Sequence, residues 1–205
     1  MVKDSIRVLL ADDQALVRGA MAALLQLEGD LDVVAEVGRG EEVVPAAREH
    51  GAQVCLLDIE MPGGDGIEAA RTLARELPQV RSLIVTTFGR PGYLRRALEA
   101  GASGFVVKDT PAEELAEAIR SVHAGRRVVD PTLATESLAG GPNPLTDRER
   151  EVLNECLEGQ SVATVATRVH LSAGTVRNYL SSAIGKTGAS NRVEAARTAQ
   201  RNGWL

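Results

Sequence analysis

Val54-Cys55-Leu56-Leu57-Asp58 joins four consecutive apolar residues to a carboxylate. A run that is apolar at every position, and not at every second one, is typical of a strand covered on both faces of a parallel sheet. Four other short apolar runs occur before residue 125, and an amphipathic segment follows each of the five runs. This alternation predicts an α/β domain built on a doubly wound, five-stranded parallel sheet.

The hydrophobic periodicity assigns each segment of this first domain to a strand or a helix. The expected strands are Ile6–Leu10, Leu31–Val37, Val54–Leu57, Leu83–Val85 and Phe105–Val107, and the expected helices are Gln14–Glu28, Glu41–His50, Gly66–Leu77, Gly92–Ala100 and Pro111–Ala124. One face of the first helix carries Leu16, Ala20, Ala23, Leu24 and Leu27. Pro45 lies in the middle of the second helix, where a proline removes a hydrogen bond and tends to break the helix.

The alternation ends near residue 125, and turn-forming glycines and prolines follow it. We therefore expect a first domain at residues 1–125, a linker at 126–143 and a second domain at 144–205. Every segment of the second domain has helical periodicity, which predicts a small all-α domain.

Two helices of the second domain, Ser161–Val169 and one that begins at Ser172, are joined by a short turn. The later helix has an inward stripe of Val176, Leu180, Ala183, Ile184 and Thr187, and an outward face of Arg177, Asn178, Ser181, Ser182 and Lys186 without a carboxylate. Arginine and asparagine can hydrogen-bond to base edges in the major groove of double-stranded DNA, while serine and lysine reach phosphates. The pattern predicts a helix-turn-helix, with a helical bundle that has a polar face as the alternative. Thr146 and Glu149 form a capping box at the start of the domain.

The 205 residues carry a formal charge of −5, which at first argues against a nucleic-acid partner. Fifteen basic and twenty-two acidic side chains give residues 1–141 a net charge of −7, whereas residues 142–205 carry +2. From Gln160 to Leu205, six basic side chains oppose a single acidic one, so this segment carries +5. A basic segment within an acidic chain is typical of a polyanion-binding domain, although a solvated helix face would give the same charges.

Four of the five apolar runs of the first domain are followed by residues suited to chemistry: Asp12 and Asp13, Asp58, Thr86 with Thr87, and Lys108. In open α/β sheets the ligand site lies beyond the carboxyl ends of the strands, so these side chains converge on one edge. Three neighbouring carboxylates repel one another and need a counter-charge, which Mg²⁺ can supply. We expect a carboxylate nucleophile that forms an acyl phosphate. Taken singly, each residue has a structural alternative as a helix cap, a turn residue or a surface lysine.

Three motifs of the first domain resemble the receiver domain of two-component response regulators. The motifs are Val8-Leu9-Leu10-Ala11-Asp12-Asp13, Leu57-Asp58-Ile59-Glu60-Met61-Pro62-Gly63-Gly64-Asp65-Gly66 and Gly101-Ala102-Ser103-Gly104-Phe105-Val106-Val107-Lys108. The resemblance covers residues 6–124 and implies a flavodoxin-like strand order. The sequence departs from many receivers at Asp109, where a proline often follows the lysine.

The resemblance also implies a role for each residue of the site. Asp58 would accept a phosphoryl group from a cognate sensor histidine kinase, and Lys108 would contact the phosphoryl oxygens. Mg²⁺ would be bound by Asp12, Asp13, Asp58 and the backbone carbonyl of Glu60. Thr86 and Phe105 would form a switch pair, in which the hydroxyl turns toward the phosphate and the ring moves inward.

The second domain resembles the LuxR/FixJ-type helix-turn-helix over residues 144–205. The matching residues are Leu145-Thr146-Asp147-Arg148-Glu149, Val152-Leu153, Val165-Ala166, Leu171-Ser172, Thr175-Val176-Arg177-Asn178-Tyr179, Asn191-Arg192 and Glu194-Ala195. The resemblance implies that Arg177, Asn178 and Ser181 face the bases, and that Thr175, Lys186 and Arg192 face the DNA backbone. Gly174 and Gly185 stand where the family usually has long side chains.

A receiver followed by this module is the architecture of NarL/FixJ response regulators. This architecture implies a cytoplasmic transcription regulator. Its only catalytic activity would be the gain and loss of its own aspartyl phosphate. Phosphorylation of Asp58 would promote a homodimer that binds two DNA half-sites about 10 base pairs apart. Two cysteines a hundred residues apart and the lack of a long apolar run agree with a cytoplasmic chain without membrane insertion. Thr86–Tyr93 and Thr175–Tyr179 most resemble the branch that controls fatty-acid desaturation and membrane fluidity.

Three other functions remain open from the sequence. A regulator that uses the receiver fold without phosphorylation would not need the complete set of aspartates, threonine and lysine. A phosphatase of the haloacid-dehalogenase type would need an aspartate two residues after its nucleophile, where this chain has Glu60. A ligand-sensing quorum regulator would need a pocket, for which 2% aromatic residues and an apolar sheet offer little.

Overall fold

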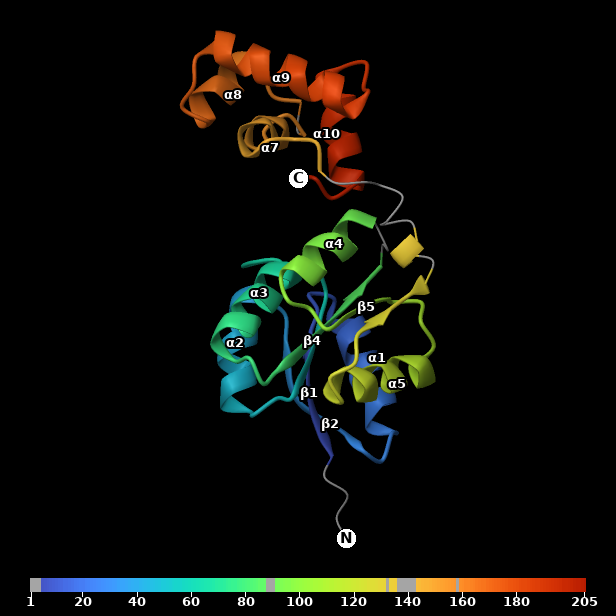
Figure 1. The fold of residues 1–205 in the computed structure, drawn as a ribbon. Coiled ribbons are helices and arrows are strands. Elements are labelled where there is room, and N and C mark those ends of the chain that lie inside the picture. Colours follow the sequence, from blue (N-terminus) through green and yellow to red (C-terminus); the bar gives the residue numbers. More distant parts are fainter. Residues whose placement is uncertain (1–4, 88–90, 132, 136–142, 158) are drawn as a thin grey trace. The chain divides into compact units, whose positions relative to one another are not determined.

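The computed structural model describes residues 5–87, 91–131, 133–135, 143–157 and 159–205 (Figure 1). The chain forms two compact units, and the first ends at Ala134. Residues 132 and 136–142 of the expected linker lie outside the described residues. Within the described part, every helix is too short or too polar to cross a membrane.

The first unit is built on a six-stranded parallel sheet in the order β2-β1-β3-β4-β5-β6. The strands are β1 (Ile6–Ala11), β2 (Leu31–Val37), β3 (Val54–Leu57), β4 (Arg81–Thr86), β5 (Gly104–Val107) and β6 (Val128–Val129). All four residues of β3 are buried, as its continuous apolar run predicts for a central strand. The predicted doubly wound sheet is thus confirmed, and the strand order reverses between β1 and β3, which is where ligands bind in such folds.

The sheet has one strand more than the five that we expected. Val128 and Val129, which we assigned to the linker, pair with Gly104 and Phe105 and extend the sheet beyond β5. Two residues are too few to show a strand periodicity, and the neighbouring turn residues Asp130-Pro131 favour a linker. Val128 packs against the core of the first unit, which holds this short strand beside β5.

Two layers of helices cover the sheet (Figure 1). The helices of this unit are α1 (Ala15–Gln26), α2 (Gly40–Glu49), α3 (Gly66–Glu76), α4 (Pro91–Glu99) and α5 (Ala112–His123). α1 and α5 pack together on one face of the sheet, where Leu25 and Ile119 join a core with Val8 and Leu56, and α2 and α3 pack together on the other face. α2 continues through Pro45, because Val43 and Ala47 on either side of the proline are buried.

The apolar face that we identified on the first helix is its exposed face. Leu16 and Leu27 are 86% and 81% exposed, and Ala20, Ala23 and Leu24 are exposed as well. The helix contacts the sheet through a different side, which carries Ala22 and Leu25. α1 is therefore apolar on two sides, and one of these sides is left uncovered by the described residues of the first unit.

The second unit consists of four described helices around its own core. They are α7 (Asp147–Asn154), α8 (Val162–Arg168), α9 (Ala173–Thr187) and α10 (Arg192–Arg201). Each helix begins with a side chain that caps its free N–H groups: Thr146, Ser161, Ser172 and Asn191. The core contains Val152, Val165, Val176 and Ala195, one residue from each helix among others. The predicted all-α domain is confirmed, with α8 and α9 joined by the expected turn.

Candidate functional site

Three carboxylates meet at the carboxyl ends of β1 and β3, as the sequence predicts. Oxygen atoms of Asp12, Asp13 and Asp58 all lie within 4.8 Å of one another. Asp12 and Asp58 are buried, whereas Asp13 is exposed at the mouth of the site. The three side chains come together because β1 and β3 are neighbours at the point where the strand order reverses.

Lys108, which follows β5, supplies a positive charge to this cluster. Its Nζ donates a hydrogen bond to Asp58 Oδ2 at 3.0 Å and lies 2.7 Å from Asp12 Oδ2. Burial alone would lower the pKa of the ammonium, but the two carboxylates together outweigh burial and raise that pKa above its ordinary value. One ammonium faces three carboxylates, so the cluster keeps an excess of negative charge.

Asp58 is held in place by its own backbone and by the neighbouring strand. Its N–H donates to the carbonyl of Ala11 at 2.8 Å, and its Oδ1 accepts a hydrogen bond from the N–H of Ile59 at 2.8 Å. Burial raises the pKa of its carboxyl group, and Lys108 only partly offsets this effect. Behind it, a Cβ atom at Gly66 would lie 2.0 Å from the Asp58 carbonyl oxygen, so only glycine fits at the start of α3.

The two carboxylate oxygens of Asp12 have different partners. Oδ1 accepts a hydrogen bond from the N–H of Gln14 at 2.9 Å, whereas the buried Oδ2 forms an ion pair with Lys108 Nζ at 2.7 Å. The Arg18 guanidinium of α1 donates to the backbone carbonyl of Asp12. Arg18 could not be predicted from a local pattern, because its contact depends on how α1 folds back over the end of β1.

A cavity of about 70 Å³ opens beside the acidic cluster, lined by Asp13, Gln14, Asp58, Glu60, Thr86 and Thr87. Thr86 ends β4 and is buried, and the side chain of Glu60 is exposed. Phe105 lies in β5 and is fully buried, opposite Ile84 in the register of the sheet. Of the residues expected to act on a phosphoryl group, Asp58 and Thr86 line this cavity, and Lys108 reaches Asp58 from the end of β5.

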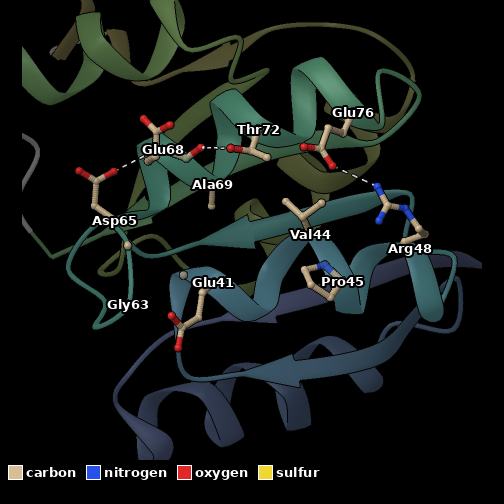
Figure 2. A pocket seen from close by; sticks show the side chains of 12 residues that line it. Glu41, Val44, Pro45, Arg48, Gly63, Asp65, Glu68, Ala69, Thr72 and Glu76 are labelled. Atoms are coloured by element: carbon tan, nitrogen blue, oxygen red, sulfur yellow. Dashed lines mark hydrogen bonds and ion pairs between the residues drawn. The ribbon is translucent and has the colours of Figure 1, made fainter.

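A second cavity, of about 300 Å³, lies between α2 and α3 (Figure 2). Arg48 and Glu76 form an ion pair at one end, and Glu41, Gly63 and Asp65 surround the other end. Each carboxylate that lines this cavity has an arginine within 4 Å, in the pairs Glu41–Arg39, Asp65–Arg96, Glu68–Arg71 and Glu76–Arg48. The charges in this groove are therefore compensated, unlike those of the acidic cluster.

The exposed surface of α9 carries three of the residues predicted to bind DNA. Arg177, Asn178 and Ser181 are exposed on the side away from the buried residues Val176 and Leu180. Two other predicted contacts lie close by at helix starts. Thr175 is half-buried beside the cap of α9, with its hydroxyl 2.8 Å from that of Ser172, and Arg192 is the first residue of α10.

Lys186 and Ser182, which we expected on an outward face without a carboxylate, both contact Glu149 of α7. Ser182 Oγ donates to Glu149 Oε1 at 2.6 Å, and Lys186 Nζ donates to Oε2 at 2.7 Å. Burial alone would raise the pKa of Glu149, but these donors and Thr146 lower it to about 2. The sequence showed Glu149 only as a capping residue, because a contact between residues 37 positions apart leaves no local pattern.

The two units have the sequence signatures of two known domains. Residues 8–120 match the response regulator receiver domain, and residues 143–199 match the luxR family of bacterial regulatory proteins. The chain therefore belongs to the two-component response regulators with a LuxR-type DNA-binding domain, a family of transcription regulators.

Full-length relatives share this arrangement. The transcriptional regulatory protein DesR of Bacillus subtilis (strain 168) is 43% identical over 200 residues, which cover 98% of this chain and 99% of DesR. YvfU of the same strain, an uncharacterized transcriptional regulatory protein, is 42% identical over 98% of this chain and 100% of its own. The crystal structure of the response regulator ChrA, of a heme-sensing two-component system, is 33% identical with a TM-score of 0.60 and covers 98% of this chain and 99% of that chain.

The membrane-fluidity branch remains a prediction from the sequence. DesR and YvfU are almost equally similar to this chain, so overall identity does not select a set of target genes. Residues 88–90 of the segment Thr86–Tyr93, on which the prediction depends, lie outside the described residues.

Proposed function

We propose that Asp58 is the phosphoacceptor of this regulator and that its phosphorylation switches the chain to the DNA-binding form. A carboxylate oxygen of Asp58 attacks the phosphorus of a phosphohistidine on the sensor kinase. The P–N bond breaks, and its electron pair leaves with the imidazole. The observation that supports this role is the position of Asp58, which is buried at the 70 Å³ cavity between Lys108 and two further carboxylates.

The donor set also fits a divalent cation. Three carboxylates meet here and a single ammonium, that of Lys108, pairs with two of them, so the cluster keeps a negative charge and the oxygen ligands that a hard cation prefers. Asp12, Asp13, Asp58 and the backbone carbonyl of Glu60 would hold Mg²⁺. When bound, the ion neutralises the charge on the phosphoryl oxygens during transfer.

The remaining residues of the site would respond to the phosphoryl group. Lys108 is already 3.0 Å from Asp58 Oδ2 and would move its hydrogen bond to a phosphoryl oxygen. Thr86 lines the same cavity and would hydrogen-bond to another oxygen. Phe105 is fully buried here, which agrees with the inward position that the resemblance implies for the ring of the activated switch pair.

Phosphorylation of the intact chain tests this assignment. Incubation with acetyl phosphate and Mg²⁺ should add one phosphoryl group, and intact-protein mass spectrometry would measure it. Asp58→Asn should prevent the gain, whereas Asp32→Asn, at an exposed carboxylate of β2, should leave it unchanged. A phosphoryl group on the Asp58→Asn protein would refute the assignment.

For the second unit we propose that α9 enters the major groove of double-stranded DNA. Arg177, Asn178 and Ser181 would contact base edges, and Thr175 and Arg192 would contact the backbone. The exposure of the first three side chains on one surface of α9 supports this proposal. Two copies related by a twofold axis would place their α9 helices in half-sites about 10 base pairs apart.

A further inference from the structure

Glu149 is a buried carboxylate at the junction of α7 and α9. It is 3% exposed and accepts hydrogen bonds from the N–H of Thr146, from Ser182 Oγ and from Lys186 Nζ, all between 2.6 and 2.7 Å. An ionised carboxylate has about four acceptor positions, so three donors nearly saturate it. Two of the three donors come from α9, and they fix the later half of this helix against α7.

Lys186 is on a different side of α9 from Arg177 and Ser181, whereas Asn178, the third residue proposed to contact bases, lies one turn before Ser182 and shares its side. Arg177 and Ser181 are one turn apart and share a side, as do Ser182 and Lys186. At 3.6 residues per turn, Lys186 is rotated by about 140° from Ser181 around the helix axis. Its side chain retains 35% exposure, but the ammonium group is engaged with Glu149 at 2.7 Å.

We propose that Glu149 is a positioning residue of the DNA interface, which orients α9 through Ser182 and Lys186. In this proposal the ammonium group of Lys186 binds Glu149 and does not bind a DNA phosphate. The proposal rests on the role of α9 in DNA binding and replaces the backbone contact that the family resemblance implies for Lys186. Glu149 itself touches no DNA, because it is buried beneath the helix that does.

Salt dependence of DNA binding separates the two roles of Lys186. The full chain, activated with beryllium fluoride and Mg²⁺, would be titrated with a DNA duplex that the wild type has selected from random sequence. A lysine on a phosphate contributes about 0.9 to the slope of log K against log salt concentration. Lys186→Met should weaken binding about tenfold through misplacement of α9 and leave that slope unchanged. Arg192→Met, the matched control at a proposed backbone contact, should lower the slope by about 0.9.

A double-mutant cycle tests whether Lys186 acts through Glu149. Glu149→Gln keeps the shape of the side chain and removes its charge. If the two residues act as a unit, Lys186→Met should cost little further affinity in the Glu149→Gln background. Lys186→Arg, which keeps a cation that can reach Glu149, should restore most of the affinity that Lys186→Met loses.

Two results of the DNA titrations would overturn the proposal: a lower salt slope for Lys186→Met, or an equal loss of affinity from Lys186→Met in the wild-type and Glu149→Gln backgrounds. Thermal unfolding of the same variants, followed by the fluorescence of Trp204, measures the Glu149–Lys186 coupling without DNA. An absence of coupling in unfolding would contradict the proposal even if a variant no longer bound the duplex. If instead the wild type selected and bound no duplex, while the Glu149–Lys186 coupling in unfolding was intact, the proposed role of α9 in DNA binding would be wrong.

Discussion

At the scale of single residues, burial opposes the ionisation of both Asp58 and Glu149, yet the pKa values of the two carboxyl groups shift in opposite directions. For Asp58, burial outweighs Lys108 and raises the pKa. For Glu149, Lys186, Ser182 and Thr146 outweigh burial and lower the pKa to about 2. The difference follows from the donors. Glu149 has three strong donors directed at it, whereas Asp58 shares its lysine with Asp12.

The lowered pKa of Glu149 makes the stability of the second unit depend on pH. The unfolded chain binds a proton on this residue near pH 4.5 and the folded chain only near pH 2, so the stabilisation is complete above pH 4.5 and is lost as the pH falls toward 2. A difference of this size corresponds to about 3 kcal/mol. Urea unfolding, followed by Trp204, should show the free-energy gap between wild type and Glu149→Gln shrinking over this range.

Trp204 is the chain's single tryptophan and packs against the core of the second unit, so its fluorescence follows the unfolding of this unit. A gap that stayed constant from pH 6 to pH 3 would show that Glu149 does not carry the predicted pKa.

At the scale of secondary-structure elements, α1 shows how far a pattern can predict a fold. Its apolar residues recur at helical spacing, so the helix could be predicted, but a helix with two apolar sides does not reveal which one meets the sheet. β6 was missed for a different reason: Val128 and Val129 are too short a run to show periodicity. The acidic cluster was predictable because strand ends of a parallel sheet share an edge, whereas the Glu149–Lys186 contact joins two helices far apart in the sequence.

The exposed side of α1 leads to a prediction about assembly. We propose that Leu16 and Leu27, which are 86% and 81% exposed, form part of the dimer interface of the phosphorylated chain. Leu16→Glu or Leu27→Glu should leave phosphorylation intact and keep the activated chain monomeric, because a charge would be buried on association. Light scattering measures the mass, and Gln26→Glu, which adds the same charge on another side of α1, is the control. If both leucine variants still formed the dimer, the dimer interface would lie on another surface of the chain.

Substitution by alanine should have opposite effects on stability at two glycines near the end of α9. Nothing lies within 4 Å of a Cβ atom added at Gly185, inside the helix, whereas Gly188 ends the helix with a φ of +66°. Gly185→Ala should therefore stabilise the second unit by about 1 kcal/mol, and Gly188→Ala should destabilise it. Urea unfolding measures both changes. A loss of stability in Gly185→Ala would contradict the open surroundings of this position.

At the scale of the whole molecule, the net charge of −5 is the sum of segments with charges of opposite sign and different proposed functions. The acidic residues 1–141 include the carboxylates proposed to serve cation and phosphoryl chemistry, and the segment from Gln160 to Leu205, with a charge of +5, contains α9 and α10. The sequence could predict this division and both domain classes, because each depends on local composition and motifs. How phosphorylation in one domain changes the other depends on an assembled state that local patterns do not describe.

The mass of the full chain in solution, measured by light scattering with and without beryllium fluoride and Mg²⁺, tests the phosphorylation switch most directly. We predict that the mass doubles on treatment of the wild type, and that Asp58→Asn, which lacks the acceptor carboxylate, stays at the untreated mass. A doubling that persists in Asp58→Asn, or a wild type that takes up beryllium fluoride without any change in mass, would contradict activation through phosphorylation of Asp58.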